Sequence, residues 1–348
     1  MPKSIVGIDI TATRLVAAEV ANPDSKRPSL VKAAAVALDE GVARDGEVID
    51  GAAVTAAIRE LWSLAKFGSK RVVLGVGNQR VLVRDHTVDQ MTPDQLRQAL
   101  PFQVADILPV PVTETILDFY PVELVEGSSP QQVNGLLVAA LKEGVEADVD
   151  ALEAARLKVA GVDLSPFAIL RALRAGDTLA GTHTIVAFGP RTTFLVVAQD
   201  GIPRFVRIVA AGAENITDSV MSVTGWNHDQ ATQAKQQLGI LHGNDPKYGQ
   251  ASNAVLQAVT EILGSIRSTN NFYLSNRDDA EIESVILLGS ETALPGLVDA
   301  VREFVGLPAT VGDPLAAVRR PKHLKLLGAL AGSEADLAIP VGLALGGK

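Results

Sequence analysis

The segment Ile5-Val6-Gly7-Ile8-Asp9-Ile10-Thr11-Ala12-Thr13-Arg14 begins the pattern that decides the fold. Its apolar part, over residues 4–10, predicts a buried strand, and the small polar residues at 11–13 predict a tight turn. Apolar strands follow over 14–20 and, after a polar loop, over 29–38. A helix and a further strand are expected next, over 51–66 and 71–76. Three hairpin-connected strands, a helix and another strand predict a mixed α/β domain.

The same order of elements recurs from residue 184 onward. Strands are expected over 184–188, 193–198 and 202–210, and Gly189-Pro190-Arg191-Thr192 forms the turn between the first two. Two helices then follow, over 215–224 and 229–238. A shared order of strand, turn, strand, turn, strand indicates a duplicated unit. This architecture resembles the actin-like superfamily of α/β proteins, in which two related RNase H-like halves hold a nucleotide in the cleft between them.

The stretch between the two halves has a different pattern. Thr92-Pro93-Asp94 predicts the capped start of a helix that runs to about residue 107, where Pro109-Val110-Pro111 stops it. Strands over 115–125 and 131–141 and a helix over 146–160 are expected next. Helix, strand, strand and helix describe a small α+β subdomain inserted in the first half.

These elements predict domain limits along the chain. The expected divisions are a first actin-like half over 1–78, the insert over 79–165, a connecting helix over 166–182, and a second half over 183–348 with a helical part at about 240–282.

Several motifs resemble one family, the PilM proteins of type IV pili. Together with the strand pattern that begins at Ile5, they extend to Leu345, so the resemblance covers nearly the whole chain. The motifs are Thr92-Pro93-Asp94-Gln95-Leu96-Arg97-Gln98-Ala99-Leu100-Pro101-Phe102-Gln103-Val104-Ala105-Asp106-Ile107-Leu108-Pro109, Val138-Ala139-Ala140-Leu141-Lys142-Glu143, Ala160-Gly161-Val162-Asp163-Leu164-Ser165-Pro166-Phe167-Ala168, Ala293-Leu294-Pro295-Gly296-Leu297 and Pro340-Val341-Gly342-Leu343-Ala344-Leu345.

The resemblance implies a cytoplasmic scaffold at the inner face of the membrane. PilM proteins bind the N-terminal cytoplasmic peptide of the membrane protein PilN, and the inserted subdomain forms much of the groove. A motor of the PilB or PilT type and a regulator of the PilZ type are further partners that the family implies. The candidate groove residues are Phe102, Val104, Ile107 and Leu108. Each of them can instead pack the core of the insert.

The nucleotide motifs of the superfamily are eroded in this sequence. The first phosphate turn, usually Asp-x-Gly, is Asp9-Ile10-Thr11, in which a β-branched residue replaces the glycine. The second turn is Ala187-Phe188-Gly189 and lacks the carboxylate, and Ser165 stands where relatives have Glu. The adenosine loop is Gly289-Ser290-Glu291, and the helix that frames the base lacks its Glu in Ala231-Thr232-Gln233-Ala234-Lys235. Phosphoryl transfer depends on positioned charges, so these changes predict that catalysis is lost.

Weak binding of ATP with Mg²⁺ stays open, because some residues of the cleft are kept. We therefore predict no catalytic residue and no metal-ligand set. The candidate nucleotide contacts are Asp9, Thr11, Thr13, Arg14, Gly189, Thr192, Thr193, Gly212, Lys235, Gly289 and Ser290.

Composition agrees with an acidic protein of the cytoplasm. The net charge is −9, which argues against nucleic-acid binding, since that requires a basic surface. The chain has no cysteine, which excludes disulfides and thiolate chemistry. No apolar run reaches the roughly 20 residues of a membrane span, and the apolar start is too short for a signal peptide, so neither direct membrane insertion nor export is expected.

Three alternatives are open on sequence grounds. The first is an active actin-like ATPase or kinase of the same superfamily, which Ala187 and Ser165 disfavour because neither is a carboxylate. The second is the cytoplasmic domain of a type II secretion protein, and the third is an FtsA-like role in cell division. Both are disfavoured because no membrane helix or amphipathic membrane anchor follows Leu345.

Overall fold

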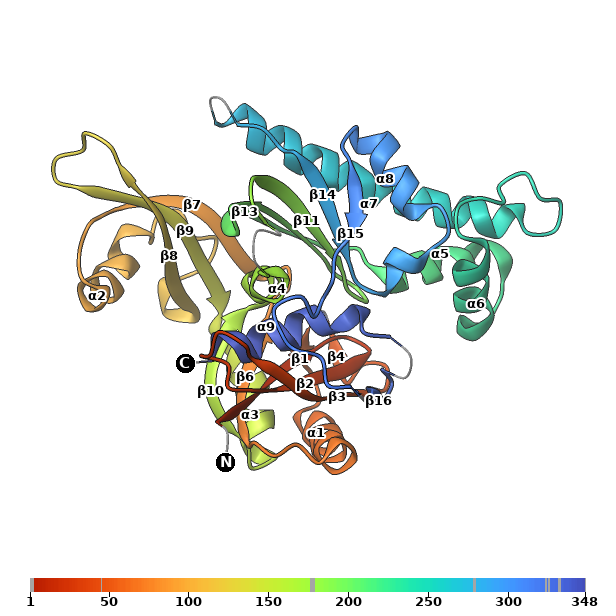
Figure 1. Ribbon diagram of the computed structural model, residues 1–348, viewed down its shortest axis with the longest axis horizontal. Coiled ribbons are helices and arrows are strands. Elements are labelled where there is room, and N and C mark those ends of the chain that lie inside the picture. The colour runs from red at the N-terminus through yellow and green to blue at the C-terminus, as the bar shows by residue number, and fades with distance from the viewer. Residues whose placement is uncertain are drawn as a thin grey trace.

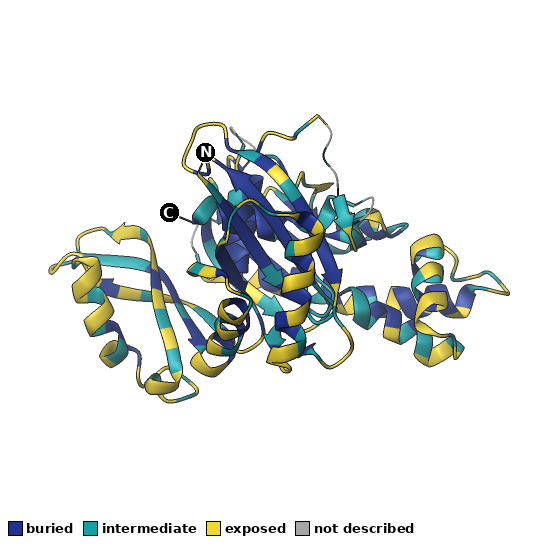
Figure 2. Ribbon diagram, turned by 90° about the horizontal axis from the view of Figure 1, so that it is seen from below, coloured by how far each residue is buried: buried dark blue, intermediate teal, exposed yellow. Residues whose placement is uncertain are grey.

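The computed structural model describes residues 3–44, 46–175, 179–277, 280–322, 324, 326–330 and 333–347. Two sheets form the body of the molecule, and a third, smaller sheet projects to one side (Figure 1). Buried residues concentrate in the strands of the body, whereas the helices on the outside of the molecule turn exposed faces to solvent (Figure 2). Among the described residues, no helix has the length and apolar composition to cross a membrane.

The sheet of the first half has six strands in the order β10-β6-β1-β2-β3-β16. Their bounds are β1 Ser4–Ile10, β2 Arg14–Ala21, β3 Ser29–Ala37, β6 Arg71–Val76, β10 Lys158–Leu164 and β16 Leu326–Gly328. The first three pair antiparallel as a meander, and β6 joins β1 in parallel. The predicted strands of the first half are therefore confirmed. A short hairpin, β4 Ala43–Arg44 and β5 Glu47–Val48, precedes the first helix.

Helices pack on this sheet. The helices α1 Gly51–Ala65 and α3 Lys142–Ala154 contact each other, and α1 also lies on β3. The helices α4 Ser165–Leu173 and α9 Ala338–Gly346 contact each other, and α9 lies directly on β1. A Cβ at Gly7 would lie 1.9 Å from the carbonyl oxygen of Pro340, so only glycine allows α9 to pack this closely.

The second half repeats this plan. Its sheet has the order β13-β12-β11-β14-β15, with an antiparallel meander followed by parallel strands. The bounds of its strands are β11 Thr182–Phe188, β12 Thr193–Gln199, β13 Ile202–Val209, β14 Ser284–Leu288 and β15 Ala309–Val311. The helices are α5 Ala213–Thr224, α6 His228–Leu238, α7 Gly249–Ser275 and α8 Leu297–Val305. The two matching sheets confirm the predicted duplication.

The insert is a three-stranded sheet with one helix. The strands β7 Val81–Asp89, β8 Thr115–Val125 and β9 Gln132–Leu141 have the order β7-β9-β8. The helix α2 Pro93–Gln103 contributes Leu100 to a small core with strand residues on one face of the sheet. Thr92 caps α2 as expected, because its hydroxyl accepts from the N–H of Gln95, whose side chain accepts from the N–H of Thr92 at 3.0 Å. A short 3₁₀ turn, η1 Val112–Glu114, leads into β8.

Three sequence predictions in this region are wrong in detail. The helix expected to run to residue 107 ends at Gln103, although Pro109 stands six residues further on. The helix expected over 146–160 is α3, which ends at Ala154, and Arg156 then adopts a left-handed φ of 64°. The residues that follow form β10, which pairs in parallel with β6. The strand β7 was not predicted at all.

The chain also returns to the first half at its end, which the predicted limits missed. The strand β16 pairs in parallel with β3, and α9 lies on β1. The strand β10 and the helix α3 likewise belong to the first sheet and its helical layer, so they are not part of the insert. We therefore propose an insert of 81–141 and a first half that includes 142–173 and the final segment from 326.

Candidate functional site

The hairpin turns of the two halves face each other across a cleft. A cavity of about 70 Å³ lies between them, bordered by Asp9, Thr11 and Arg14 from the first half and by Gly189, Thr192 and Gly289 from the second. Pockets for small organic ligands usually measure roughly 300–1000 Å³. The cleft in this structure is therefore much smaller than a nucleotide requires.

In the first turn, the side chain of Thr11 forms hydrogen bonds with backbone groups of the same turn. The hydroxyl of Thr11 accepts hydrogen bonds from the N–H groups of Arg14, at 3.1 Å, and Thr13, at 3.4 Å, and donates to the carbonyl of Arg14 at 2.8 Å. In an anion-binding turn, these N–H groups would be directed at the ligand. Thr11 thus supplies the oxygen that a phosphate would provide.

The second turn is closed by the start of α5. The N–H groups of Ala213 and Glu214, which begin this helix, donate to the carbonyls of Gly189 at 3.0 Å and Pro190 at 2.7 Å. A Cβ at Gly212 would lie 2.3 Å from the carbonyl oxygen of Gly189, so glycine is required for this approach. The N–H groups at a helix start are a common anion site, and here they are paired internally.

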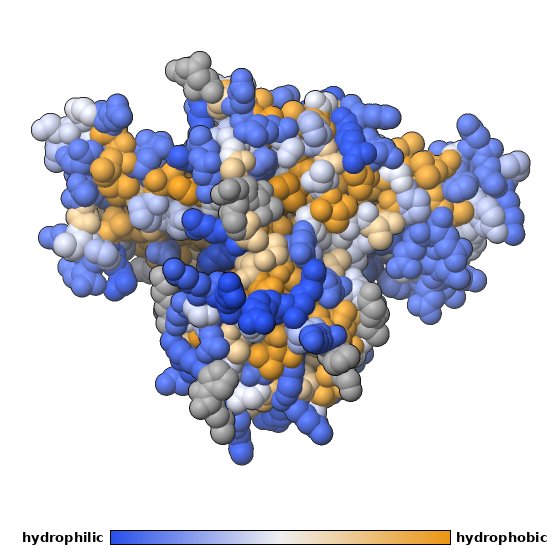
Figure 3. Space-filling view, in the orientation of Figure 1, coloured by the Kyte–Doolittle hydropathy of each residue, from blue (hydrophilic) through white to orange (hydrophobic). Residues whose placement is uncertain are grey.

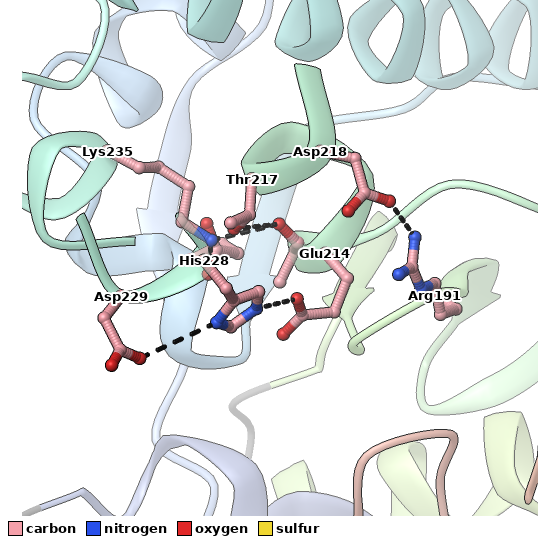
Figure 4. Close-up of polar contacts among 9 residues, drawn as sticks. Arg191, Glu214, Thr217, Asp218, His228, Asp229 and Lys235 are labelled. Atoms are coloured by element: carbon pink, nitrogen blue, oxygen red, sulfur yellow. Dashed lines mark hydrogen bonds and ion pairs between the residues drawn. The ribbon is translucent and has the colours of Figure 1, made fainter. Parts of the chain in front are cut away.

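Lys235 is held by an ion pair inside the second half. Its Nζ lies 3.2 Å from Oε1 of Glu291 and donates to the carbonyl of Ala213 at 3.0 Å. Both charged side chains are less than 10% exposed, 4% and 8%. Figure 4 shows Lys235 reaching toward the start of α5, where Glu214 also accepts from His228 at 2.8 Å. The acid that replaces a loop glycine therefore neutralises the lysine kept from the superfamily motif.

Arg14 is paired with the C-terminal segment. Its Nη2 lies 2.8 Å from Oδ2 of Asp336, in the short turn η3 Ala335–Leu337 that leads into α9. Burial raises the pKa of the nearby Asp9 to about 7, which Arg14 opposes and Asp336 reinforces. Near neutral pH, Asp9 is thus a poor source of the full negative charge that a hydrated metal ion needs.

An aromatic ring of the second half also reaches across the cleft. A Cβ at Gly77 would lie 2.8 Å from the ring of Phe194, and 3.2 Å from Cβ of Ser165. The ring of Phe194 therefore packs against the backbone of the first half at Gly77, close to Ser165. Sequence reasoning missed both Phe194 and Asp336, because their contacts join segments far apart in the chain.

The predicted nucleotide residues are only partly brought together. Asp9, Thr11, Arg14, Gly189, Thr192 and Gly289 border the cavity. The remaining candidates, Thr13, Thr193, Gly212, Lys235 and Ser290, do not border it. Within the described ranges, no group of three or more His, Asp or Glu could hold a metal ion. In this arrangement the residues present do not fit a magnesium nucleotide, since the N–H groups of Thr13 and Arg14 and the ammonium of Lys235 already have internal partners.

The predicted partner residues of the insert divide into two kinds. Phe102 is 86% exposed and Ile107 is 40% exposed, so both are on the surface. Val104 is fully buried in the insert core and Leu108 packs against that core, so the prediction that Val104 faces a partner is wrong. Figure 3 shows apolar side chains gathered over the insert, at the left of the molecule, among hydrophilic ones.

Comparison of the sequence and the structure with known proteins identifies the family of this chain. A family model described as type IV pilus assembly protein PilM matches residues 7–348. The chain belongs to the PilM family. This member is also similar to a solved structure titled PilM-PilN type IV pilus biogenesis complex, with 25% identity, a TM-score of 0.83, and coverage of 99% of this chain and 98% of that one.

More distant relatives of this PilM family member share the fold. It is 20% identical over 331 residues to the cell division protein FtsA of Bacillus subtilis (strain 168), covering 82% of this chain and 74% of FtsA. The ethanolamine utilization protein EutJ of Carboxydothermus hydrogenoformans has 15% identity and a TM-score of 0.58, covering 99% of this chain and 90% of that one. These similarities confirm the predicted actin-like fold.

Proposed function

We propose that this protein is a scaffold of type IV pilus assembly that binds the N-terminal cytoplasmic segment of a PilN-like inner-membrane protein. The observation that carries the proposal is the similarity, over nearly the whole of both chains, to a PilM solved as a PilM-PilN complex. The family match from residue 7 to the end supports the same function. Recruitment by such a partner would place the protein at the inner face of the cytoplasmic membrane. A PilB- or PilT-type motor and a PilZ-type regulator are further proposed partners.

The insert is the part of the molecule best suited to partner binding. It projects from the body (Figures 1 and 2). It also exposes the aromatic side chain of Phe102, which water solvates poorly. Exposed aromatic residues are frequent anchors at protein interfaces. Ile107 lies in the turn after α2 and adds a second apolar contact.

The internal hydrogen bonds of the cleft favour a scaffold function over an enzymatic one. The N–H groups of Thr13 and Arg14 in the first turn donate to an oxygen of the protein itself, and so do the N–H groups at the start of α5. Lys235 is paired with Glu291. A ligand would have to displace these bonds and enlarge the cavity. We propose that the pocket stabilises the contact between the two halves and that nucleotide binding is weak.

A binding experiment tests the scaffold function. A synthetic peptide with the N-terminal sequence of the PilN-like protein from the same operon is titrated into the purified protein in a calorimeter. Phe102→Ala and Ile107→Ala are expected to weaken binding about tenfold each, a typical loss for an interface anchor. Leu241→Ala is the matched control, since Leu241 is 65% exposed but lies in the second half. A peptide that gives no heat at any concentration would refute the function.

The alternative, an active ATPase or kinase, is favoured only by Asp9, which borders the cavity. It predicts magnesium-dependent ATP turnover that Asp9→Ala abolishes. A turnover above about one ATP per minute is already slow for an enzyme. If the protein reached that rate and Asp9→Ala abolished the turnover, the scaffold function would be overturned.

A further inference from the structure

The charge of the protein is distributed unevenly over the fold. The insert, residues 81–141, contains eight acidic and two basic residues, a net charge of −6 out of −9 for the whole chain. Five of its acids form no ion pair with any described residue: Asp89, Asp106, Glu114, Asp118 and Glu126. Positive charge is concentrated elsewhere, at one edge of the first-half sheet, where residues from separate segments meet.

This edge lies at the N-terminal end of β1, whereas the cleft lies beyond the C-terminal end of β1 at Thr11. Ser4 at the start of β1 pairs with Ala21, the last residue of β2, so the turn that follows β2 lies at the same edge. That turn carries Lys26 and Arg27. It therefore brings two cations to the edge of the sheet opposite the cleft.

The strands β6 and β10 begin at the same edge, because β6 is parallel to β1 and β10 is parallel to β6. Arg71 starts β6 and pairs with Lys158, which starts β10. The N–H of Lys158 donates to the carbonyl of Lys70 at 2.8 Å, so the loop before β6 also lies here. Lys66 begins this loop directly after α1, and Arg156 follows α3. Figure 1 shows α1 and α3 in the lower part of the body, away from the second half.

These cations form a row, which we name the basic edge. Its members are Lys26, Arg27, Lys66, Lys70, Arg71, Arg156 and Lys158. All are exposed except Arg71, which is half-buried, and none forms an ion pair with a residue that the structure describes. The segments that carry them, 22–28, 66–71 and 155–158, contain one acid, Asp24, which pairs with Lys3 at 3.1 Å. The charge of the basic edge is thus not neutralised by acids of the same segments.

An aromatic pair lies beside the basic edge. The ring centroids of Trp62, near the end of α1, and Phe67 are 5.0 Å apart, and both residues are half-buried. The indole Nε1 of Trp62 donates to the carbonyl of Ser69 at 3.2 Å, which holds the pair against the loop that carries Lys66 and Lys70. Half-exposed aromatic residues next to Lys and Arg are typical of surfaces that lie at the level of lipid headgroups.

We propose that the basic edge contacts the anionic phospholipid headgroups of the membrane that carries the partner, without insertion into the bilayer. This inference rests on the proposed scaffold function, because the partner's tail brings the protein to that surface. The row extends from β10 to the turn between β2 and β3, and five neighbouring strands at about 4.8 Å spacing make it roughly 20 Å wide. A row of this width faces several headgroups at once.

The local charge of the basic edge governs this contact, although the net charge of the chain is −9. Charges further than about 8 Å from the lipid surface are largely screened at physiological ionic strength, so the nearest cations dominate. Each cation close to an anionic surface strengthens binding about fivefold. A protein tethered by its partner also meets the surface at a high effective concentration, so a weak contact is enough to orient it.

Vesicle co-sedimentation of the purified full-length protein tests the inference. Vesicles of phosphatidylcholine with about 30% phosphatidylglycerol present an anionic surface, and vesicles of phosphatidylcholine alone do not. We expect binding to the anionic vesicles at about 0.05 M NaCl, a fall of about tenfold at about 0.3 M, and little binding to the neutral vesicles. The double variant Lys70→Glu and Lys158→Glu should bind the anionic vesicles at least about tenfold more weakly.

The matched control is the double variant Arg84→Glu and Lys247→Glu. Both residues are exposed, and neither forms an ion pair within the described ranges. Arg84 lies on β7 in the insert, and Lys247 lies just before α7 in the second half. The control makes the same change in net charge and should bind vesicles as the parent protein does. Circular dichroism melting checks that both variants are folded, and the salt dependence of the parent protein needs no variant.

Two vesicle results would overturn the inference. The first is a parent protein that binds anionic and neutral vesicles equally or binds neither. The second is an equal loss in the two double variants, because the attraction would then be a property of the whole molecule. A short DNA duplex that binds the parent protein as tightly as the anionic vesicles do would also overturn it, since the basic edge would then bind polyanions in general.

Calorimetry with the PilN-like peptide, in the absence of vesicles, separates this inference from the scaffold function. The Lys70→Glu and Lys158→Glu variant should bind the peptide with the affinity of the parent protein. Peptide binding without vesicle binding overturns the lipid contact and leaves the scaffold function in place. Vesicle binding without peptide binding supports the lipid contact and refutes the scaffold function.

Discussion

The polar groups of the cleft and those of the insert surface differ in whether they have partners inside the protein. In and beside the cleft, the N–H groups of Thr13 and Arg14, the start of α5 and the Nζ of Lys235 have partners inside the protein. On the insert, five acids form no ion pair with any residue that the structure describes, and Phe102 is 86% exposed. Groups that are already paired must break bonds before they bind, whereas unpaired charges and exposed rings gain from contact. The comparison favours the proposal that partners bind on the insert and not in the cleft.

The largest expected effect comes from breaking the ion pair of Lys235. Glu291→Ala leaves a buried ammonium without its partner and should lower the free energy of unfolding by about 3–5 kcal/mol. The double variant Lys235→Met and Glu291→Leu should recover most of that loss, because no buried charge remains. Urea denaturation measures both. A loss of stability below about 1 kcal/mol in Glu291→Ala would mean that the ion pair between Lys235 and Glu291 contributes little to the stability of the folded protein.

The second-largest expected effect concerns how the stability of the fold depends on pH. Asp148 is 2% exposed and accepts from the N–H of Val48 at 2.9 Å. Burial raises its pKa to about 7, although the Val48 N–H lowers it, and Glu47 and Asp9 raise it further. Since the folded pKa lies above the ordinary value, the folded state holds the proton more tightly, and stability is lost as pH rises from about 4 to about 7.

Asp148→Asn keeps an acceptor oxygen without the charge. It should be more stable than the parent protein by about 2–4 kcal/mol at about pH 8, and the two should converge near pH 4. Asp9, whose pKa is also about 7, retains its own contribution over the same range in this variant. Denaturation curves at several pH values check this, and a constant difference across the range would contradict it.

The third effect separates the core of the insert from its surface. Val104→Ala removes buried methyl groups and should lower stability by about 1–3 kcal/mol. Phe102→Ala should change stability by less than about 0.5 kcal/mol, because its ring is almost fully exposed. Thermal melts of the two variants compare them directly. A larger loss for Phe102→Ala would show that the ring packs inside the protein.

The smallest effect tests whether the cleft can be reopened. Asp336→Asn removes the carboxylate that faces Arg14 and frees its guanidinium for an anion. Affinity for a fluorescent ADP analogue should rise about threefold, in keeping with a partly exposed ion pair. Arg14→Gln in the same background is the control and should cancel the gain. An Asp336→Asn variant with unchanged affinity would mean that other contacts keep the cleft closed.

Local patterns were enough for most of the secondary structure. The meanders over β1–β3 and β11–β13 were expected because alternating apolar strands and small-residue turns are encoded in adjacent residues. The cap of α2 at Thr92 was visible for the same reason. The extent of α3 was not, because β10 forms only when its residues find β6, more than 80 positions earlier.

The site was predicted less completely than the fold. The resemblance to the superfamily indicated that carboxylates and glycines were missing from the cleft, and it gave Phe102 as a candidate groove residue. It could not indicate that Thr11 satisfies its own turn, because a hydroxyl can point in several directions until the backbone is fixed. It also placed Val104 with Phe102, although one is buried and the other exposed.

The sequence by itself determined the family, the duplicated α/β plan and the acidity of the insert, since each depends on residue types and their order. Only the tertiary structure decided which groups are already paired. Arg14 with Asp336 and Lys235 with Glu291 join positions 322 and 56 residues apart. Such pairs depend on how the sheets and their connections pack, and a side chain's availability for a ligand depends on the partner that this packing provides.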